Sequence, residues 1–387
     1  MKKREIYLDH AATTPVDAAV FKKMLPYFSE KYGNPSSLHK AGDQAQAGVI
    51  KARQQIASFL NCLPEEIYFT AGATESDNWI INGIVEKARQ NIKKPHIITS
   101  SFEHNAILEP IRVLEKNGLI EASLLSVDKD GLIGLDQLKK AIKKNTVLVS
   151  IMYANSEIGT VQPIKQIGEL IKKINPKIVF HTDAVQAVNY LNCDVNNLNL
   201  DALSLSGHKI YGPKGIGALY LKKEIPITSL IRGGGHERGK RSGTENVPGI
   251  IGLGEAITVI KKQSHDKIKK LRNKLITGIL RDIPDSYLNG SLEYRLPNNA
   301  HFSFKGVEGE GIVIALSETG IYVSTGSACA SHSLSPSHVL TAIGLSNEQA
   351  HTSIRFTLGR QTREGDINHV LEVLPKIIKR LRKISGR

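Results

Sequence analysis

The chain has 387 residues, of which 41% are hydrophobic and 23% charged, and its formal net charge is +14. This length predicts two or three domain-sized units with a substantial core, and the composition is that of an ordinary soluble globular protein. No apolar run could cross a bilayer or serve as a signal peptide, and the scattered lysines form no basic block with interleaved aromatics, so we expect neither membrane nor nucleic-acid binding.

Apolar runs alternate with helical patterns through the first two thirds of the chain. This alternation predicts a mostly parallel sheet with helices on both faces. Ligands of such sheets bind outside the carboxyl ends of the strands, so the residues that follow each strand are the first candidates for a site. The expected strands are 66–70, 96–100, 146–153, 177–183, 201–207 and 215–221, and the expected helices are 75–90, 104–118 and 164–174.

The pattern changes after about residue 222. A glycine-rich basic loop, "RGGGHERGKRSGT" (232–244), precedes a long amphipathic helix expected near 249–281. Short strands and helices then follow one another, which predicts a second, smaller α+β domain. Its expected strands are 300–304, 320–324 and 353–358, and its last expected helix is 367–384.

The first expected strand is followed by "TAGATESDN" (70–78). Gly72 permits a tight turn, and Ala73 and Thr74 open a helix whose free N–H groups and dipole favour an anion such as phosphate. The alternative is an ordinary threonine cap, with Asp77 three residues on as in a capping box.

Two further strands end in candidate side chains. His104 comes at an expected helix start, where the dipole and burial favour a neutral imidazole suited to stacking or proton transfer. A surface histidine is the alternative. Asp183 ends a strongly apolar strand, where burying a carboxylate costs free energy unless the group has an interaction partner or a function. Gln186 follows it at helical spacing, and the alternative for Asp183 is a helix N-cap.

The turn "SGHKIYGPKG" (206–215) contains Ser206, His208 and Lys209 between two apolar strands. A partly desolvated Lys209 would be a usable amine nucleophile, whereas a solvated turn lysine is the alternative. The turn is not a P-loop, because Pro213 stands where the lysine should be. Pyridoxal 5'-phosphate requires a phosphate-binding site, an imidazole, a buried carboxylate and a lysine amine, and the candidates above include all four.

The chain has three cysteines, Cys62, Cys193 and Cys329, which lie far apart. Their odd number and spacing argue against a disulfide framework and predict a reducing, cytoplasmic location. No C-x-x-C occurs, and we expect no metal site. Cys62 and Cys193 follow apolar residues, which favours inert packing. Cys329 lies in "STGSACAS" (324–331), which is typical either of an accidental loop cysteine or of a nucleophile or redox sensor.

The chain resembles the cysteine desulfurases, which are pyridoxal-phosphate enzymes of the NifS/IscS type. The resemblance covers nearly the full length and is carried by ten motifs in order. They are "YLDHAATTPV" (7–16), "GNPSS" (33–37), "TAGATESDN" (70–78), "EHNA" (103–106), "NSEIG" (155–159), "HTDAVQA" (181–187), "SGHKIYGPKGIGALY" (206–220), "GGGHERGKRSGT" (233–244), "STGSACAS" (324–331) and "AHTSIRFTLGR" (350–360).

The resemblance implies an α/β fold of the aminotransferase-like class (fold type I). It implies a large, mostly parallel-sheet domain at 14–260, and a small α+β domain made of 1–13 and 261–387. The small domain would carry a mobile cysteine loop at about 324–335, in which small residues and Gly326 allow movement.

The resemblance also implies roles for single residues. Lys209 would hold the cofactor covalently, and His104 would stack on its ring and shuttle protons. The catalytic sulfur acceptor would be Cys329. The other implied ligands are Asp183 for the ring nitrogen, Gln186 for the phenolic oxygen, Ala73, Thr74, Ser206 and His208 for the phosphate, Thr244 for the phosphate of the partner in a homodimer, and Asn155 and Arg355 for the substrate carboxylate.

The implied reaction converts L-cysteine to L-alanine and leaves the sulfur as a persulfide on Cys329, for transfer to an acceptor protein that serves iron–sulfur cluster assembly or another sulfur product. "STGSAC" resembles the long-loop group of the family. Ser156 stands where the family has asparagine, with a small expected effect. The chain ends at "LRKISGR", without the longer tail of the general iron–sulfur members, so NifU-like, IscU-like and other acceptors stay open.

Two alternative functions are kept. One stays within the fold: a selenocysteine lyase, or an aminotransferase-like enzyme that does not use the thiol, which Cys329→Ala would distinguish. The other is a basic RNA- or partner-binding protein, which would be colourless and would bind polyanions with steep salt dependence.

Overall fold

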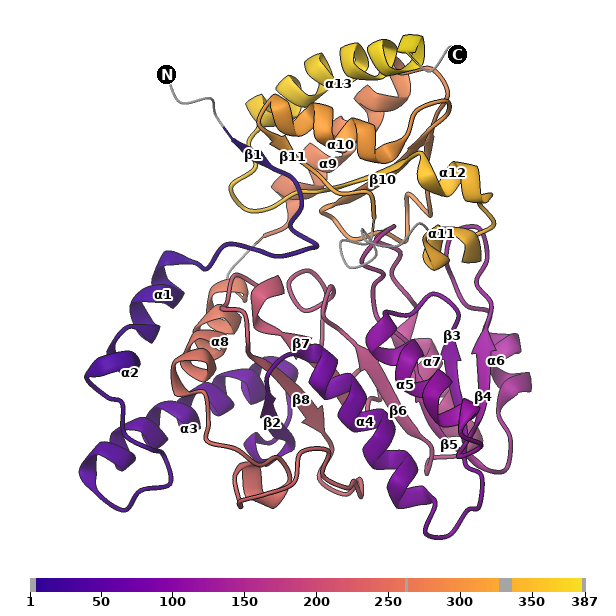
Figure 1. Cartoon of the computed structure of the whole chain (residues 1–387). Coiled ribbons are helices and arrows are strands. Elements are labelled where there is room, and N and C mark those ends of the chain that lie inside the picture. The colour runs from indigo at the N-terminus through magenta and orange to yellow at the C-terminus, as the bar shows by residue number, and fades with distance from the viewer. Residues whose placement is uncertain (1–4, 262–263, 327–335, 385–387) are drawn as a thin grey trace.

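The computed structural model describes residues 5–261, 264–326 and 336–384. Its largest unit is a seven-stranded sheet in the order β2-β8-β7-β6-β5-β3-β4 (Figure 1). β8 is antiparallel to both of its neighbours, and the remaining pairs are parallel, so the expected mostly parallel sheet is confirmed. The strands are β2 (Ile67–Thr70), β3 (His96–Ser100), β4 (Glu121–Leu125), β5 (Thr146–Ser150), β6 (Val179–Asp183), β7 (Ala202–Ser206) and β8 (Gly217–Leu221).

Helices cover both faces of this sheet, as expected. Successive strand residues point to opposite faces, so Ile97 joins the core under α4 and α5, whereas Ile98 joins the core under α3, α6, α7 and α8. The bounds are α3 (Lys40–Leu60), α4 (Ala73–Ala88), α5 (Asn105–Lys116), α6 (Leu135–Ala141), α7 (Ile164–Ile174) and α8 (Val247–Ile260). Two short helices, α1 (Ala18–Met24) and α2 (Pro26–Ser29), lead into α3.

A second unit has its own core and its own sheets. Its three-stranded sheet has the antiparallel order β12-β10-β9, and β1 pairs with β11 in parallel. The N-terminal strand therefore lies with the C-terminal part of the chain (Figure 1). The division at 14–260, and at 1–13 with 261–387, stays a prediction. The elements are β1 (Ile6–Tyr7), α9 (Asp266–Asp282), β9 (Ser286–Leu288), β10 (Asn299–Phe304), α10 (Gly309–Glu318), β11 (Ile321–Tyr322), α11 (His338–Ala342), α12 (Asn347–His351), β12 (Ser353–Thr357) and α13 (Glu364–Ile384).

The single long helix expected near 249–281 is wrong, because the structure has two helices there. α8 ends at Ile260 and α9 begins at Asp266. The Ser264 hydroxyl accepts a hydrogen bond from the Asp266 N–H at 3.3 Å. A serine that bonds to nearby backbone in this way competes with helix continuation and favours a new helix start.

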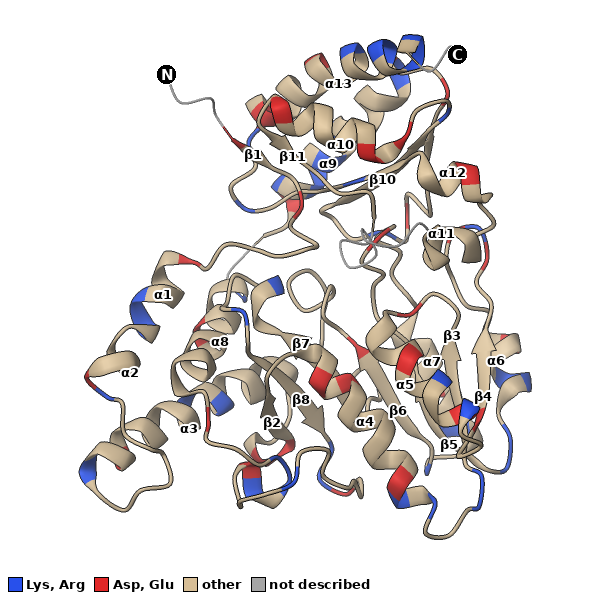
Figure 2. Cartoon of the chain, in the orientation of Figure 1, with Lys and Arg blue, Asp and Glu red and all other residues tan. Residues whose placement is uncertain are grey.

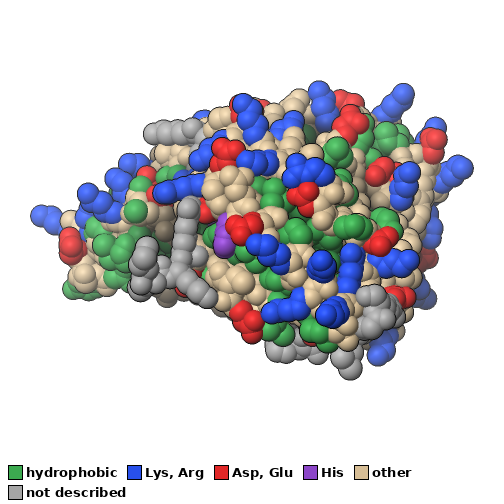
Figure 3. All heavy atoms as spheres, turned by 90° about the horizontal axis from the view of Figure 1, so that it is seen from above, with side chains coloured by type: hydrophobic (Ala, Val, Ile, Leu, Met, Phe, Trp, Pro, Cys, Tyr) green, Lys and Arg blue, Asp and Glu red, His purple; other side chains and the backbone are tan. Residues whose placement is uncertain are grey.

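The surface charge is dispersed. Lys and Arg side chains are mixed with acidic and hydrophobic ones on the upper face (Figure 3), and both signs occur along most helices (Figure 2). Among the described residues, no helix is both long and apolar enough to cross a membrane.

Candidate active site

A cavity of about 690 Å³ opens at the carboxyl ends of the parallel strands. Asp183 ends β6 and Ser206 ends β7, and both line it. Arg355 enters from β12 of the second unit. The cavity therefore brings together residues from both sheets. The other predicted site residues on its wall are Ala73, Thr74, His104, Gln186, His208 and Lys209.

The start of α4 forms one end of the cavity. Its N-cap is Gly72, which supplies no capping side chain, and Thr74 lies inside the helix and is exposed to the cavity. The threonine-cap alternative is therefore wrong. A Cβ on Gly217 would lie 2.8 Å from the Gly72 Cα, so a glycine in β8 is needed for this close approach. The uncapped N–H groups can bind an anion.

His104 is the N-cap of α5, as expected from its place at a helix start. Its Nδ1 accepts a hydrogen bond from the Ala106 N–H at 3.1 Å, which leaves the proton of a neutral ring on Nε2. Burial lowers the pKa of His104, the positive Lys209 lowers it further, and Asp183 opposes both. The ring is exposed to the cavity rather than to an outer surface.

Asp183 is nearly buried at the end of β6. Burial raises the pKa of Asp183, whereas the Val185 N–H, donating at 2.9 Å, and the neighbours His104 and Lys209 lower it. Among the described residues no helix begins there, so the N-cap alternative is wrong. Gln186 donates from Nε2 to the Ala11 carbonyl at 3.1 Å.

Lys209 lies in the short 3-10 turn Gly207–Lys209 that follows β7. Its Nζ donates to the carbonyls of Ala11 and Ala12 at 2.6 and 2.8 Å. The N-terminal motif thus forms the wall opposite the lysine. His208 Nδ1 lies 3.1 Å from the Thr13 hydroxyl, and burial together with Lys209 lowers the pKa of His208 to about 4.

Arg355 is 3% exposed and lines the cavity from the side of the second unit. One nitrogen donates to Asp9 Oδ1 at 2.8 Å and another to the Ser156 carbonyl at 2.9 Å. Its buried Nε has no hydrogen-bond partner within the described ranges. A guanidinium that is fixed by these two contacts, keeps further N–H groups and lines the cavity is suited to holding a carboxylate.

Asn155 is not brought to the cavity wall, where its neighbour Ser156 stands instead. The Asn155 amide is engaged with its surroundings: Nδ2 donates to the Phe102 carbonyl at 3.2 Å, and Oδ1 accepts from the N–H groups of Glu157 and Ile158 at 2.8 and 3.0 Å. Its role in substrate binding stays a prediction.

One further predicted residue lies away from the cavity. Thr244 is exposed and is not among the residues that line it. Cys329 lies outside the described residues, as does most of the expected loop at 324–335.

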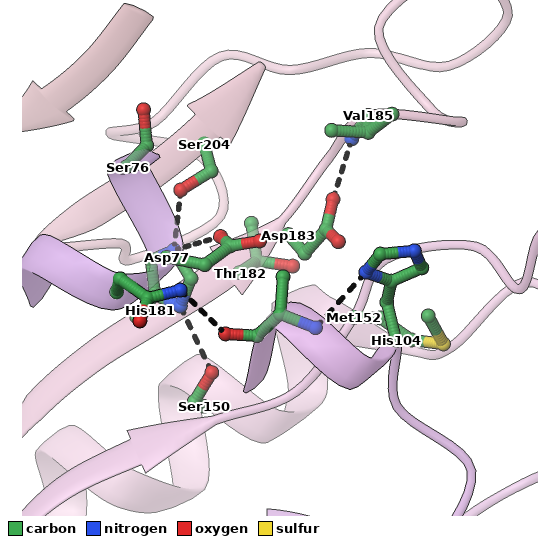
Figure 4. Close-up of polar contacts among 12 residues, drawn as sticks. Ser76, Asp77, His104, Ser150, Met152, His181, Thr182, Asp183, Val185 and Ser204 are labelled. Carbon is green, nitrogen blue, oxygen red and sulfur yellow. Dashed lines mark hydrogen bonds and ion pairs between the residues drawn. The ribbon is translucent and has the colours of Figure 1, made fainter. Parts of the chain in front are cut away.

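Sequence reasoning missed a buried polar network behind Asp183 (Figure 4). His181 lies 2.9 Å from the Ser150 hydroxyl and 3.0 Å from the Ser204 hydroxyl. Asp77, which is 1% exposed, lies 3.7 Å from His181 Nε2 and also lines the cavity. Burial, and next the neighbouring Asp183, raise the pKa of Asp77. Asp77 has the spacing of a capping residue, so the sequence carried no signal for this network.

The residues on this wall fit pyridoxal phosphate by their chemistry. Thr74 and Ser206 are hydroxyl donors beside an uncapped helix start, which suits a phosphate. Asp183 is a buried acid that suits a cationic ring nitrogen, and Lys209 is an amine for the aldehyde. Among the described residues, no cluster of His, Cys, Asp or Glu could hold a metal ion.

Comparison with known proteins gives consistent results. Residues 6–370 match the family model described as aminotransferase class-V. The chain is 50% identical to "Cysteine desulfurase IscS" of Clostridium botulinum (strain Hall / ATCC 3502 / NCTC 13319 / Type A) over 388 residues, covering 99% of this chain and 96% of that protein.

Solved structures agree with this result. A structure described as a NifS-like protein superposes with a TM-score of 0.91 at 38% identity, covering 98% of this chain and 100% of that chain. "SspA in complex with cysteine" superposes with a TM-score of 0.82 at 39% identity, covering 91% and 98%. The aminotransferase-like fold is confirmed.

Proposed function

Because the chain belongs to the aminotransferase class-V family, and within it to the cysteine desulfurases, we propose how its own residues carry out the conversion of L-cysteine to L-alanine. These families depend on pyridoxal phosphate in general. One observation carries the proposal: a single cavity joins Lys209, Asp183 and His104 at the end of one sheet with Arg355 from another.

When bound, pyridoxal phosphate supplies an aldehyde for an amine and a ring that accepts electrons. The uncapped start of α4 at Ala73, with Thr74, Ser206 and His208, would bind its phosphate. Asp183 would bond the ring nitrogen, because a cationic partner there offsets the cost of burying this carboxylate. Gln186 would bond the phenolic oxygen.

Substrate binding would use Arg355, with Asn155 as a further predicted ligand. The place of Arg355 on the cavity wall, with N–H groups beyond its two hydrogen bonds, supports a contact with the cysteine carboxylate. Lys209 would take the proton from the substrate Cα. Neutral His104 would stack and pass a proton through the nitrogen that the Ala106 N–H leaves free.

The sulfur would move to Cys329. The Cys329 thiolate would attack the substrate Sγ, a sulfur–sulfur bond would form, and the carbon–sulfur bond would break. Alanine would leave after its carbon is protonated, and Cys329 would keep the transferred sulfur as a persulfide. An acceptor protein of NifU-like, IscU-like or another kind would then take it.

A homodimer is supported by an apolar surface on α1 to α3. Large hydrophobic side chains are exposed there, including Phe28 at 61% and Tyr32 at 74%. A second copy that covers this surface would remove it from water. Thr244, which stays outside its own cavity, would then be available to the phosphate in the partner. The cytoplasmic location stays a prediction from the cysteine content.

The test is to supply L-cysteine and a reductant to the purified protein and to measure alanine, sulfide and the visible absorbance of the cofactor. We expect a yellow protein that forms alanine and sulfide in equal amounts. A colourless protein that gains no absorbance from added pyridoxal phosphate, forms no alanine, and binds polyanions with a steep salt dependence would contradict the proposal.

A further inference from the structure

Glu75 is an acidic side chain in the wall that would hold the cofactor phosphate. It lies in the first turn of α4, next to Thr74, and lines the same cavity. Its Oε2 accepts a hydrogen bond from the Ala71 N–H at 2.8 Å, which fixes the turn before the helix. A carboxylate this close to a bound phosphate would repel it unless another group neutralised the carboxylate.

Arg241 supplies the neutralising charge from a distant part of the chain. Its Nε donates to Glu75 Oε1 at 2.9 Å and its Nη2 to Glu75 Oε2 at 3.1 Å. The two side chains are only 20% and 12% exposed, so solvent screens the pair weakly. A forked contact of this kind fixes orientation as well as charge.

The loop 232–244 that carries Arg241 is held at a second point. Both oxygens of Glu237 accept from Arg53, at 2.7 and 2.8 Å, and one also accepts from the Phe69 N–H at 3.1 Å. Glu237 and Arg238 adopt φ values of 45° and 58°, which side chains rarely take and which the surrounding contacts must stabilise. The loop therefore has one defined conformation on β2 and α4.

We propose that Glu75 and Arg241 are a positioning pair that joins the phosphate-binding turn of α4 to the loop 232–244. The inference rests on the proposed function, in which the turn binds the cofactor phosphate and Thr244, three residues beyond Arg241, serves the partner. Glu75 holds the loop in place through Arg241, and Arg241 cancels the charge that Glu75 would otherwise present to the phosphate. Neither residue needs to touch the cofactor.

Loss of Arg241 should specifically weaken binding of the phosphate group. In Arg241→Gln, Glu75 keeps its charge without a partner, so affinity for pyridoxal phosphate falls about tenfold or more. Affinity for pyridoxal, which lacks the phosphate, stays within about threefold because the repulsion acts on the phosphate. The double variant Glu75→Gln, Arg241→Gln recovers most of the lost affinity.

The experiment titrates the apoprotein of each variant with pyridoxal phosphate and with pyridoxal, following absorbance, and repeats the first titration against inorganic phosphate as a competitor. Arg232→Gln is the matched control, because Arg232 starts the same loop but pairs with Glu86 on the surface, where the side chains are 69% and 53% exposed. We expect this control to bind both ligands as the wild type does.

Three results would overturn the inference. They are wild-type affinity in Arg241→Gln, an equal loss for pyridoxal and pyridoxal phosphate, and a double variant no better than the single one. If Arg241→Gln does not fold, Arg241→Lys replaces it; because lysine keeps the charge but not the fork, its loss of affinity for pyridoxal phosphate should be less than about tenfold and should not extend to pyridoxal. A larger loss in Arg241→Lys would also overturn the inference. Failure of the wild type itself to bind pyridoxal phosphate would instead refute the proposed function.

Discussion

The two halves of the cavity differ in the charge of their ionisable side chains. On the side of the large sheet, burial pushes the ionisable groups toward neutrality: it lowers the pKa of His104 and of His208 and raises the pKa of Asp183. On the side of the small sheet, Arg355 is charged, buried and already paired with Asp9. The first half therefore suits a cofactor that brings charge, and the second would offer a fixed positive charge to a substrate.

Lys209→Ala should have the largest effect on the cofactor half. Without the amine there is no covalent hold on the aldehyde and no base at the substrate Cα, so alanine formation should fall by about 10³-fold or more. Steady-state rates and a borohydride test for a cofactor that stays attached on denaturation measure this. Retention of the attached cofactor in the variant would contradict the assignment.

Asp183→Asn should have the next largest effect. The amide keeps the shape but loses the negative charge that would pair with the ring nitrogen, so kcat should fall about 10²-fold. Cofactor content, measured by absorbance after denaturation, should stay close to that of the wild type. An unchanged kcat would contradict the inference that the large-sheet half of the cavity depends on charge brought by the cofactor.

Arg355→Lys should affect the substrate half alone. Lysine keeps the charge but not the fork, so we expect KM for L-cysteine to rise about tenfold with a smaller change in kcat and unchanged cofactor content. Arg281→Lys, at a surface pair with Asp282, is the control and should leave KM unchanged. Loss of cofactor in Arg355→Lys would show that the two halves are not separate.

The smallest effect concerns stability. Burial raises the pKa of Glu103, next to His104, from 4.5 to about 8. The folded state therefore holds a proton that the unfolded state releases, and the stabilisation present below pH 4.5 is lost as the pH rises through about 8.

Glu103→Gln should remove this part of the pH dependence. Between about pH 5 and 8, the Tm of the wild type should fall more than that of the variant. Glu121→Gln, at an exposed pair with Lys143, should keep the wild-type slope. Parallel curves for the wild type and Glu103→Gln would contradict the prediction.

Much of the cofactor half could be predicted from the sequence because the strands are short apolar runs with sharp ends. Asp183, Ser206 and Lys209 follow two such runs, and parallel strands bring their carboxyl ends to one edge. The edge strand Glu121–Leu125 was not predicted, because its residues are mostly half-exposed and carry no strong apolar run.

What the sequence did not predict depends on contacts between distant residues. Arg241 and Glu75 are 166 positions apart, and no local pattern links them. Asp77 has the spacing of a capping residue, and only the packing of α4 reveals that its carboxylate is buried beside His181. The break between α8 and α9 lies within a sequence of helical character, and the contact of the Ser264 hydroxyl with the Asp266 N–H is not visible in its periodicity.

The central claim is that the cavity delivers sulfur from L-cysteine to Cys329. The most direct test measures alanine formed from L-cysteine with a reductant, in the wild type and in Cys329→Ala side by side. We predict that the wild type forms alanine and sulfide, whereas the variant binds the cofactor and forms neither. Full activity in Cys329→Ala would contradict this account and would favour a lyase that has no use for the thiol.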